Sequence, residues 1–563
     1  MRIHFKTDLK RCPSCFSPLR AYKNEYRTIR SISYGEFIAI HHIMLCRNHP
    51  GILYRSERLS SIIGPYRTYA NDVMVESALK RFIEGRSCSE IARDLNIGIS
   101  DSHVRLLSNT ALEIFGKIHE ENVQKLRSAM GSYILQIDGT VDSEFSMIVV
   151  VSDSISGFVL KARKCNAESY DEIRDILQQV KYRFGNPSGI ISDMRSGILS
   201  AIEETFPDIP HRVCLLHFLR DIGNDLMKDL HLSMGKAING IGIKSALKEI
   251  LGSIPDYDQM TLYEIEQGYC TDREKMEIMA VKRILERLLG TTGSSGYGFP
   301  FSLRHLNFYL ACREAEKELN SLRQKIDCAV STRLLSGITA LIIRVTGDDS
   351  ITDKATKLSD INRLFQRMRN AFRMPEKGNM SDDIPDDNVR ESCDLIIEGM
   401  NVYLHANIPN HIFKAAKHII SKYEQRKFLL FANNSENTIP RTNNGIERFF
   451  RKVRRNVRKR CGNIATGSIL SHSGESLAIF QNMGNLKYVS IVFGSSDIPS
   501  HFARYRKRIK RNSMTRSRIV DLVERGTKML LSDSLPGTPY TPEFLKDAYA
   551  SLTTIPRAQG RGS

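Results

Sequence analysis

Between residues 133 and 216, the chain alternates short apolar runs of strand length with longer segments of helical period. Three apolar runs come first, separated by polar or glycine turns, at 133–138, 145–151 and 157–163. Three strands in such close succession predict an antiparallel meander. The pattern then predicts a helix at 168–184, a strand at 189–193, a helix at 195–205, a strand at 211–216 and a helix from 217. This order indicates an α/β fold, in which a mixed sheet carries helices on its faces.

Helical periodicity also precedes the expected sheet, between residues 72 and about 120. Ser87 and Glu90 have the spacing of a capping box, and Ser100 can cap a further helix after a short turn. The pattern predicts a helix-turn-helix whose second helix enters the major groove of DNA. The residues that this helix would offer to bases or phosphates are Ser102, His103 and Arg105. A small helical bundle that only connects two domains is the alternative.

From about residue 230 to 430, helical periodicity is almost uninterrupted. A glycine-rich break near 290–301 predicts a flexible loop. The loop lacks the lysine of the phosphate-binding motif G-x-x-x-x-G-K-[ST], and the motif occurs nowhere else in the chain. We therefore expect no ATP hydrolysis.

Composition indicates a folded, basic protein. The 563 residues suffice for about three or four domains. The net charge of +18 favours a polyanionic partner such as DNA, although ribosomal or membrane-surface binding would fit the charge alone. No stretch approaches the roughly 18 apolar residues of a membrane span, and the first residues lack a signal-peptide core. We expect a soluble, cytoplasmic protein associated with the nucleoid.

Two short cysteine motifs near the N-terminus predict a structural zinc site. Cys12 and Cys15 form a C-x₂-C pair, and Cys46 and His49 form a C-x₂-H pair across a β-like stretch. Each motif supplies two ligands of one tetrahedron, which is zinc-ribbon spacing. Four protein ligands close the site and make it structural rather than catalytic. Coincidence among eleven cysteines is the alternative.

Three acidic residues stand where a phosphodiester-cutting site needs them. Asp138 and Asp193 each end an apolar run, and Glu447 opens a helix rich in arginine and lysine. Three converging carboxylates could hold two Mg²⁺ (or Mn²⁺) ions about 3.5–4 Å apart, as in-line displacement requires. Each acid also has a simpler explanation, because an aspartate can cap a turn and Glu447 can pair with Arg451.

The helix that follows Glu447 is strongly basic. Eight of the thirteen residues from Arg448 to Arg460 are arginine or lysine, while an apolar stripe runs along another face. One face is thus expected to pack and the other to hold a phosphate backbone. The expected DNA contacts on this helix are Arg448, Arg451, Lys452, Arg454 and Arg455. A solvated basic face is the alternative.

With these residues in view, the chain resembles bacterial or archaeal insertion-sequence transposases of the DDE class, nearest to the Mutator-like relatives. The resemblance rests on the order of four segments: QIDGT, ISDMRSGI, HRVCLLHFLRDI and NNGIERFFRKVRR. It implies an RNase H-like core with a helical insertion between the second Asp and the Glu. It also implies that Cys214 and His217 form a structural C-x₂-H element near the site. The chain departs from the family in having no tryptophan.

The resemblance implies a transposase that cleaves element ends and transfers the strands into target DNA. Its partners would be the terminal inverted repeats and the target duplex, bound by a homodimer or larger assembly. A transposase-derived DNA-binding regulator with an inert site is one alternative. An RNase H-like, structure-selective nuclease without joining activity is the other.

The expected domain order follows from these segments. It comprises a zinc-ribbon domain (1–60), a helix-turn-helix DNA-binding domain (61–127), the first part of the catalytic core (128–225), a helical insertion (226–430), the second part of the core with the Glu-bearing basic helix (431–490), and a basic C-terminal region with a flexible tail (491–563).

Overall fold

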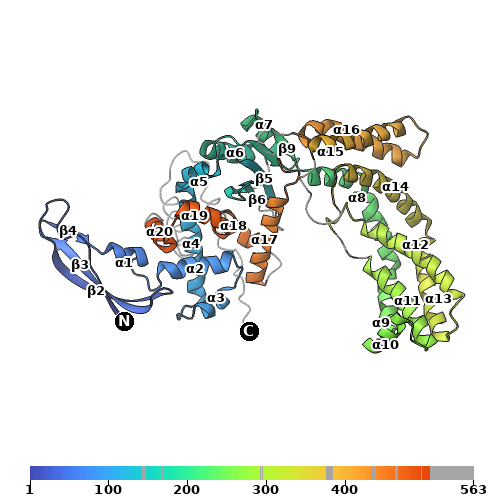
Figure 1. The fold of residues 1–563 in the computed structure, drawn as a ribbon, viewed down its shortest axis with the longest axis horizontal. Coiled ribbons are helices and arrows are strands. Elements are labelled where there is room, and N and C mark those ends of the chain that lie inside the picture. The colour runs from blue at the N-terminus through green and yellow to red at the C-terminus, as the bar shows by residue number, and fades with distance from the viewer. Residues whose placement is uncertain are drawn as a thin grey trace, which may run out of the picture. The chain divides into compact units, whose positions relative to one another are not determined.

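The computed structural model describes residues 1–506 of the chain. Within that range it does not describe residues 142–146, 166–168, 292, 294–295, 376–384, 433–438, 463–466 and 496. The expected tail, part of the glycine-rich loop and the first two positions of the second expected strand lie outside the described residues. The chain forms two compact units, drawn in Figure 1. Among the described residues, the N-terminal unit is Met1–Asp72 with Ile498–Arg506, and the central unit is Val73–Asp497.

The N-terminal unit contains a four-stranded sheet and two helices. Its elements are β1 (Arg2–Phe5), β2 (Arg20–Ser31), β3 (Gly35–Cys46), β4 (His49–Tyr54), α1 (Glu57–Ile62) and α20 (Ile498–Arg506). β3 pairs with all three other strands, parallel to β1 and antiparallel to β2 and β4. Alternate residues of β2 and β3, such as Ile29 and Phe37, are buried with Leu59 of α1, as the period of two in a strand requires.

Four helices open the central unit. They are α2 (Asn71–Phe82), α3 (Cys88–Leu95), α4 (Asp101–Glu121) and α5 (Val123–Met130). The capping box expected of Ser87 and Glu90 is present, and Ser100 caps α4 by accepting a hydrogen bond from the backbone of His103. Both local predictions are therefore confirmed. Asn96 ends α3 in the left-handed conformation, which asparagine tolerates and which turns the chain toward α4.

A mixed five-stranded sheet forms the middle of the central unit. Its strands are β5 (Ile134–Val141), β6 (Met147–Asp153), β7 (Val159–Cys165), β8 (Gly189–Ser192) and β9 (His211–Val213). Their spatial order is β7-β6-β5-β8-β9. β7, β6 and β5 are antiparallel, whereas β5, β8 and β9 are parallel. The helices α6 (Tyr170–Phe184) and α7 (Ser196–Thr205) alternate with the later strands. The predicted meander and mixed sheet are thus confirmed.

One boundary prediction is wrong. The strand expected at 211–216 ends at Val213, and the helix expected from 217 begins at Leu215. Cys214, Leu215 and Leu216 are buried like the strand residues before them. Because buried residues continue from β9 into α8, the hydrophobic pattern does not show where the strand ends and the helix begins.

A large helical region follows β9. Its helices are α8 (Leu215–Ile241), α9 (Ile243–Ser253), α10 (Gln259–Gln267), α11 (Arg273–Gly290), α12 (Arg304–Arg323), α13 (Ala329–Thr346), α14 (Asp349–Ala371), α15 (Asp386–Asn401), the 3₁₀ turn η1 (Val402–Leu404) and α16 (Asn410–Leu430). One continuous apolar core runs through them. Among the described residues of this region there is no strand, as the sequence predicts.

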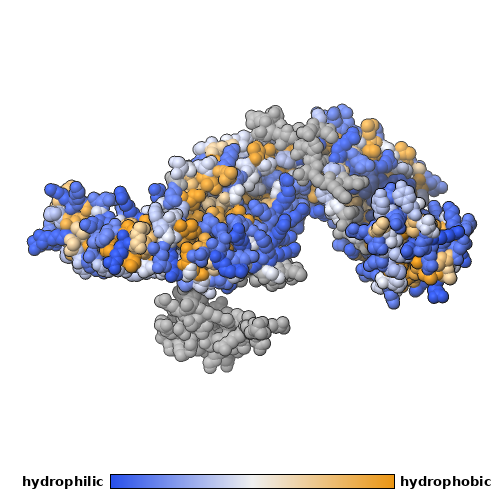
Figure 2. Space-filling model, turned by 60° about the horizontal axis from the view of Figure 1, so that its bottom comes forward, coloured by the Kyte–Doolittle hydropathy of each residue, from blue (hydrophilic) through white to orange (hydrophobic). Residues whose placement is uncertain are grey.

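One helix among the described residues, α13, is long and apolar enough to cross a membrane by length and composition. The expectation that no stretch approaches that length is corrected here. Leu335, Ile338 and Ile342 of α13 are buried in the helical core, and 33% of the helix is buried in all. Figure 2 shows that hydrophilic residues predominate on one face of the molecule, with smaller apolar patches among them.

The chain then returns to the sheet. The last elements of the central unit are α17 (Asn444–Cys461), α18 (Gly467–Phe480), the 3₁₀ turn η2 (Gln481–Gly484) and α19 (Leu486–Phe493). α18 packs against β6, β7 and α4. The Phe480 ring at its end meets the rings of Phe82 and Phe115 edge to face. The helices before and after the sheet therefore share one core with it.

Candidate active site and metal centre

Asp138 and Asp193 lie on neighbouring parallel strands of the central sheet. Ile137 of β5 is in register with Ser192 of β8, so the two aspartates that follow are adjacent at one edge. The side chain of Asp138 is only 8% exposed, and its Oδ1 accepts a hydrogen bond of 2.8 Å from the amide of Gly139. Asp193 directly follows the buried end of β8. The sheet itself therefore brings the two expected acids together.

Glu447 lies in the first turn of α17, and the segment before it is tied to the same sheet edge. Asn443 donates through Nδ2 to the carbonyl of Ile137, at 3.1 Å, one residue before Asp138. Its backbone amide donates to the sulfur of Cys214, at 3.2 Å. Gly445 allows this close approach, since a Cβ there would lie 3.1 Å from Oε1 of Gln136. The start of α17 is thereby fixed across β5.

A buried ionic network holds the same segment from the other side. Arg212 of β9 is fully buried and donates to the carbonyl of Ile439 at 2.6 Å. It also pairs with Asp386, whose other oxygen lies 3.0 Å from Nη2 of Arg441. Leu215 at the start of α8 donates to the carbonyl of Arg441, at 2.9 Å. Because burying unpaired charges is costly, removing one partner would destabilise the others.

Two cationic side chains from α8 face Glu447. Its Oε1 lies 3.8 Å from Nε2 of His217 and 3.9 Å from Nη1 of Arg220. Burial disfavours the charged form of the His217 ring, yet the neighbouring Cys214 side chain raises its pKa. The negative charges of Asp193 and Asp138 act in the same direction, and the pKa of His217 reaches about 9. The His217 ring is therefore a cation near all three acids.

The carboxyl group of Asp138 is electrostatically coupled to the other two acids. Burial raises its pKa to about 6, with further contributions from the charges of Asp193 and Glu447, while His217 opposes the increase. A bound cation would relieve this repulsion, so the donor set suits a hard metal ion. The three carboxylates do not cluster within 4.8 Å of one another, the spread seen among the cysteine ligands described below. Their spacing is wider than one shared ion requires.

The basic face of α17 begins beside Glu447. Arg448, Arg451, Lys452 and Arg455 are exposed, whereas Arg454 is partly buried and already has a partner. The apolar stripe predicted for this helix is buried, including Ile446, Phe450, Val453 and Val457. Later in the helix, Asn456 donates to the carbonyl of Ile83, at 3.0 Å, and so connects α17 to the end of α2. One face of α17 packs and the other presents positive charge to solvent.

The expected DNA contacts of the helix-turn-helix lie in the first turns of α4. Ser102, His103 and Arg105 are all exposed. At the other end of α4, His119 is buried and hydrogen-bonded to Tyr488, at 2.8 Å. The helix therefore extends from the core of the central unit and presents its N-terminal residues to solvent. The described contacts do not join these three residues to the acidic site.

The N-terminal unit brings together the four expected zinc ligands. The Cys12 sulfur lies 3.5 Å from Nδ1 of His49, and the Cys15 and Cys46 sulfurs lie 3.5 Å apart. All four ligand atoms are within 4.8 Å of one another, which suits tetrahedral zinc with Zn–S bonds of about 2.3 Å. Among the described residues, this is the only group of three or more such side chains with that geometry. The group could bind a metal such as zinc.

Three side chains of these sites escaped the sequence analysis. Tyr54 donates to the Cys12 sulfur at 3.0 Å, and this hydrogen bond lowers the pKa of Cys12 to about 5, which favours the thiolate that zinc requires. Arg220 and Asn443 contact the acidic site as described above. Arg220 lies one helical turn after His217, a spacing that could have indicated it. Tyr54 and Asn443 had no local signal.

Comparisons with known proteins add no family to this geometry. No protein-family model matches the chain, and no curated protein matches it significantly. Function is therefore inferred from the arrangement of the residues described above.

Proposed function

We propose that the protein is a DNA transposase that cleaves element ends and transfers the strands into target DNA in a metal-dependent reaction. The observation that carries this proposal is that three acids from distant parts of the sequence lie at one end of the central sheet and act electrostatically on one another. Asp138 lies on β5, Asp193 directly follows the adjacent parallel strand β8, and Glu447 is in the first turn of a basic helix fixed across β5. A turn cap or a local ion pair would not require all three to lie near one another.

The topology of the sheet supports an RNase H-like core as part of this proposal. Three antiparallel strands followed by two parallel ones put the first acid on the first strand and the second acid after the fourth. The helices from α8 to α16 lie in the chain between the second acid and the third. In this proposal they form the insertion that the resemblance implies.

Each residue of the site has a role in the proposed reaction. Asp138, Asp193 and Glu447 supply carboxylate oxygens as metal ligands. Two bound Mg²⁺ ions would activate water or a DNA 3′-hydroxyl and stabilise the leaving oxygen. His217 and Arg220 keep Glu447 oriented through their positive charges. Cys214 holds the segment before Glu447 in place.

DNA binding in this proposal uses both basic elements of the central unit. The exposed arginine and lysine side chains of α17 would hold the phosphate backbone beside the cleavage site. Ser102, His103 and Arg105 of α4 would contact the element ends in the major groove. Because two DNA ends must be joined to one target, we propose a dimer or larger assembly on DNA.

A cleavage assay with purified protein tests the proposal. The substrate is a plasmid that carries the DNA flanking the gene, incubated with Mg²⁺ or Mn²⁺. We expect the wild type to cut at the element ends and Asp138→Asn to show background cleavage with unchanged DNA binding. Glu424→Gln, an exposed acid on α16, is the matched control and should cut normally. Cleavage without joining of a 3′-hydroxyl end would favour a nuclease, and binding without any cleavage a regulator.

A further inference from the structure

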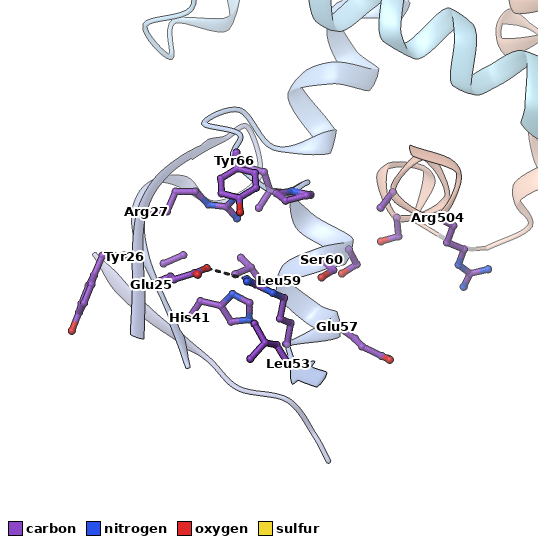
Figure 3. A pocket seen from close by; sticks show the side chains of 17 residues that line it. Glu25, Tyr26, Arg27, His41, Leu53, Glu57, Leu59, Ser60, Tyr66 and Arg504 are labelled. Carbon is purple, nitrogen blue, oxygen red and sulfur yellow. Dashed lines mark hydrogen bonds and ion pairs between the residues drawn. The ribbon is translucent and has the colours of Figure 1, made fainter. Parts of the chain in front are cut away.

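The N-terminal unit contains a large cavity outside the zinc cluster and the acidic site. Its volume is about 1190 Å³, and it lies between the sheet, α1 and α20. The lining is mixed: Leu53 and Leu59 lie among polar side chains, and the Tyr66 ring lies beside Arg27 (Figure 3). The polar and aromatic side chains of the lining include Glu25, Arg27, His41 and Tyr66.

Arg27 is a partly buried cation in this lining. It donates a hydrogen bond to the carbonyl of Gly64, at 3.0 Å, but forms no ion pair with any described carboxylate. Glu25 contributes some attraction, yet its oxygens pair with Lys23 and Arg55, each at 2.9 Å. Burial accordingly lowers the pKa of Arg27. A partly buried guanidinium without a carboxylate partner suits an anionic ligand such as phosphate.

His41 provides a second donor to the cavity. Its side chain is 8% exposed, and Nε2 accepts a hydrogen bond from the amide of Ser56, at 3.0 Å. Burial and the charge of Arg55 lower the pKa of His41, so the ring stays neutral near pH 7. A neutral ring that accepts at Nε2 carries its proton on Nδ1, which is then able to donate.

One tyrosine ring offers unused aromatic surface at the cavity. The Tyr66 side chain is 95% exposed and makes no hydrogen bond or ring contact with a described residue. Tyr66 also has a φ of +57°, a conformation that is strained for a bulky residue. Such strain is concentrated at sites where function requires it. An exposed ring held in this way is suited to stack on a planar ligand.

We propose that this cavity binds unpaired nucleotides of single-stranded DNA. Arg27 and the His41 N–H would hold phosphate or base oxygens, and Tyr66 would stack on an exposed base. Single strands expose the faces of their bases to such rings, whereas a duplex keeps them stacked inside. The inference deepens the proposed function and rests on it in one respect, namely that the polymer is DNA rather than RNA.

Fluorescence anisotropy of the full-length protein with labelled oligonucleotides tests this inference. The probes are a single-stranded DNA, an RNA of the same sequence and the corresponding DNA duplex. Tyr66→Asn removes the ring and places a residue that tolerates positive φ. We expect it to weaken single-stranded DNA binding about 10-fold or more, because base stacking on tyrosine is lost, without lowering thermal stability. Tyr66→Phe should bind like the wild type.

Two further variants test the role of the Arg27 charge and whether the effect is specific to the Tyr66 ring. Arg27→Gln should weaken binding of the same probe and reduce its salt dependence. Tyr182→Asn, which changes a ring that is 89% exposed on α6 of the central unit, should leave binding unchanged. If neither Tyr66→Asn nor Arg27→Gln changes the affinity for single-stranded DNA, the inference is overturned. Tighter binding of the RNA than of the DNA would overturn it as well.

Failure of this inference can be distinguished from failure of the proposed function. Asp138→Asn should leave single-stranded DNA binding intact, because Asp138 lies in the other unit. Cleavage at element ends without Tyr66-dependent binding would remove the inference and leave the proposed function. Tyr66-dependent binding without cleavage would support the inference and remove the proposed function.

Discussion

Cys214 connects the segment before Glu447 to the sheet through a single atom. Its buried sulfur accepts the backbone N–H of Asn443, four residues before Glu447. The C-x₂-H motif implied that Cys214 lies near the acidic residues, but no local pattern could indicate its partner. Asn443 is 229 residues away in the chain, and only the folded sheet brings the two together.

We predict that Cys214→Ala lowers both stability and activity. A buried N–H without an acceptor costs about 1–3 kcal/mol, and a loosened Asn443 would displace Glu447. Thermal melting and the cleavage assay measure the two effects. Cys393→Ala is the matched control, because Cys393 is equally buried in the helical core. Equal losses of activity in both variants would contradict a specific role for Cys214.

His119 gives a pH dependence that can be assigned to one ring. Nε2–H donates to the carbonyl of Leu160, at 3.0 Å, and Nδ1 accepts from the hydroxyl of Tyr488, at 2.8 Å. Burial lowers the pKa of His119 to about 4, below the value near 6.5 expected in the unfolded chain. Between pH 6.5 and 4, the His119 ring therefore binds more protons in the unfolded state than in the folded state.

We predict that the stability contributed by neutral His119 is complete above pH 6.5 and is lost as the pH falls toward 4. His119→Gln should reduce this slope, since glutamine does not titrate. Thermal melting between pH 4 and 7.5 measures it, with exposed His405→Gln as the control. A wild-type slope that His119→Gln leaves unchanged would show that other groups determine it.

Among the elements, α17 shows what periodicity can and cannot predict. Its apolar stripe was evident in the sequence because buried positions recur at helical spacing. What the stripe packs against was not evident. Asn456 meets the carbonyl of Ile83, and Lys459 meets that of Glu84, across more than 370 residues. Packing partners at such separations depend on the tertiary fold.

The exposed face of α17 is expected to bind phosphates. We predict that the double variant Arg451→Gln/Arg455→Gln weakens DNA binding equally for all sequences. It should also reduce the slope of log K against log salt concentration by about 2, one for each lost contact. Salt titrations measure this. Arg313→Gln/Arg333→Gln removes two exposed charges from the helical region and should leave the slope unchanged. If Arg451→Gln/Arg455→Gln leaves the salt slope unchanged, the exposed face of α17 is solvated and does not bind phosphates.

We predict that the two cysteine motifs of the N-terminal unit depend on a bound metal ion for stability. Their own apolar core is small, with Cys12, Leu19 and Cys46 buried in it. Cys15→Ser should therefore remove the bound zinc and lower the melting temperature of this unit, since structural zinc contributes directly to folding. Zinc content and thermal melting measure this, with Cys270→Ser as the control. Full zinc occupancy in Cys15→Ser would exclude the four-ligand site.

For the whole molecule, the order of secondary structure was more predictable than its grouping. The strands and helices of the central sheet followed from periodicity, whereas the division into units did not. The chain from Ile498 joins the N-terminal unit, where α20 packs on α1, although more than 400 residues separate them. Likewise, the cavity lined by Tyr66 has no signature in the sequence, because its walls come from four separate segments.

We propose that Asp138, Asp193 and Glu447 perform transposition as one site. Excision and integration of a marked element, built from the DNA flanking the gene, test this proposal by comparing wild type with Glu447→Gln. We predict that wild type moves the element, and that the variant binds the element ends but does not move it. If Glu447→Gln moves the element as efficiently as wild type, the claim is contradicted.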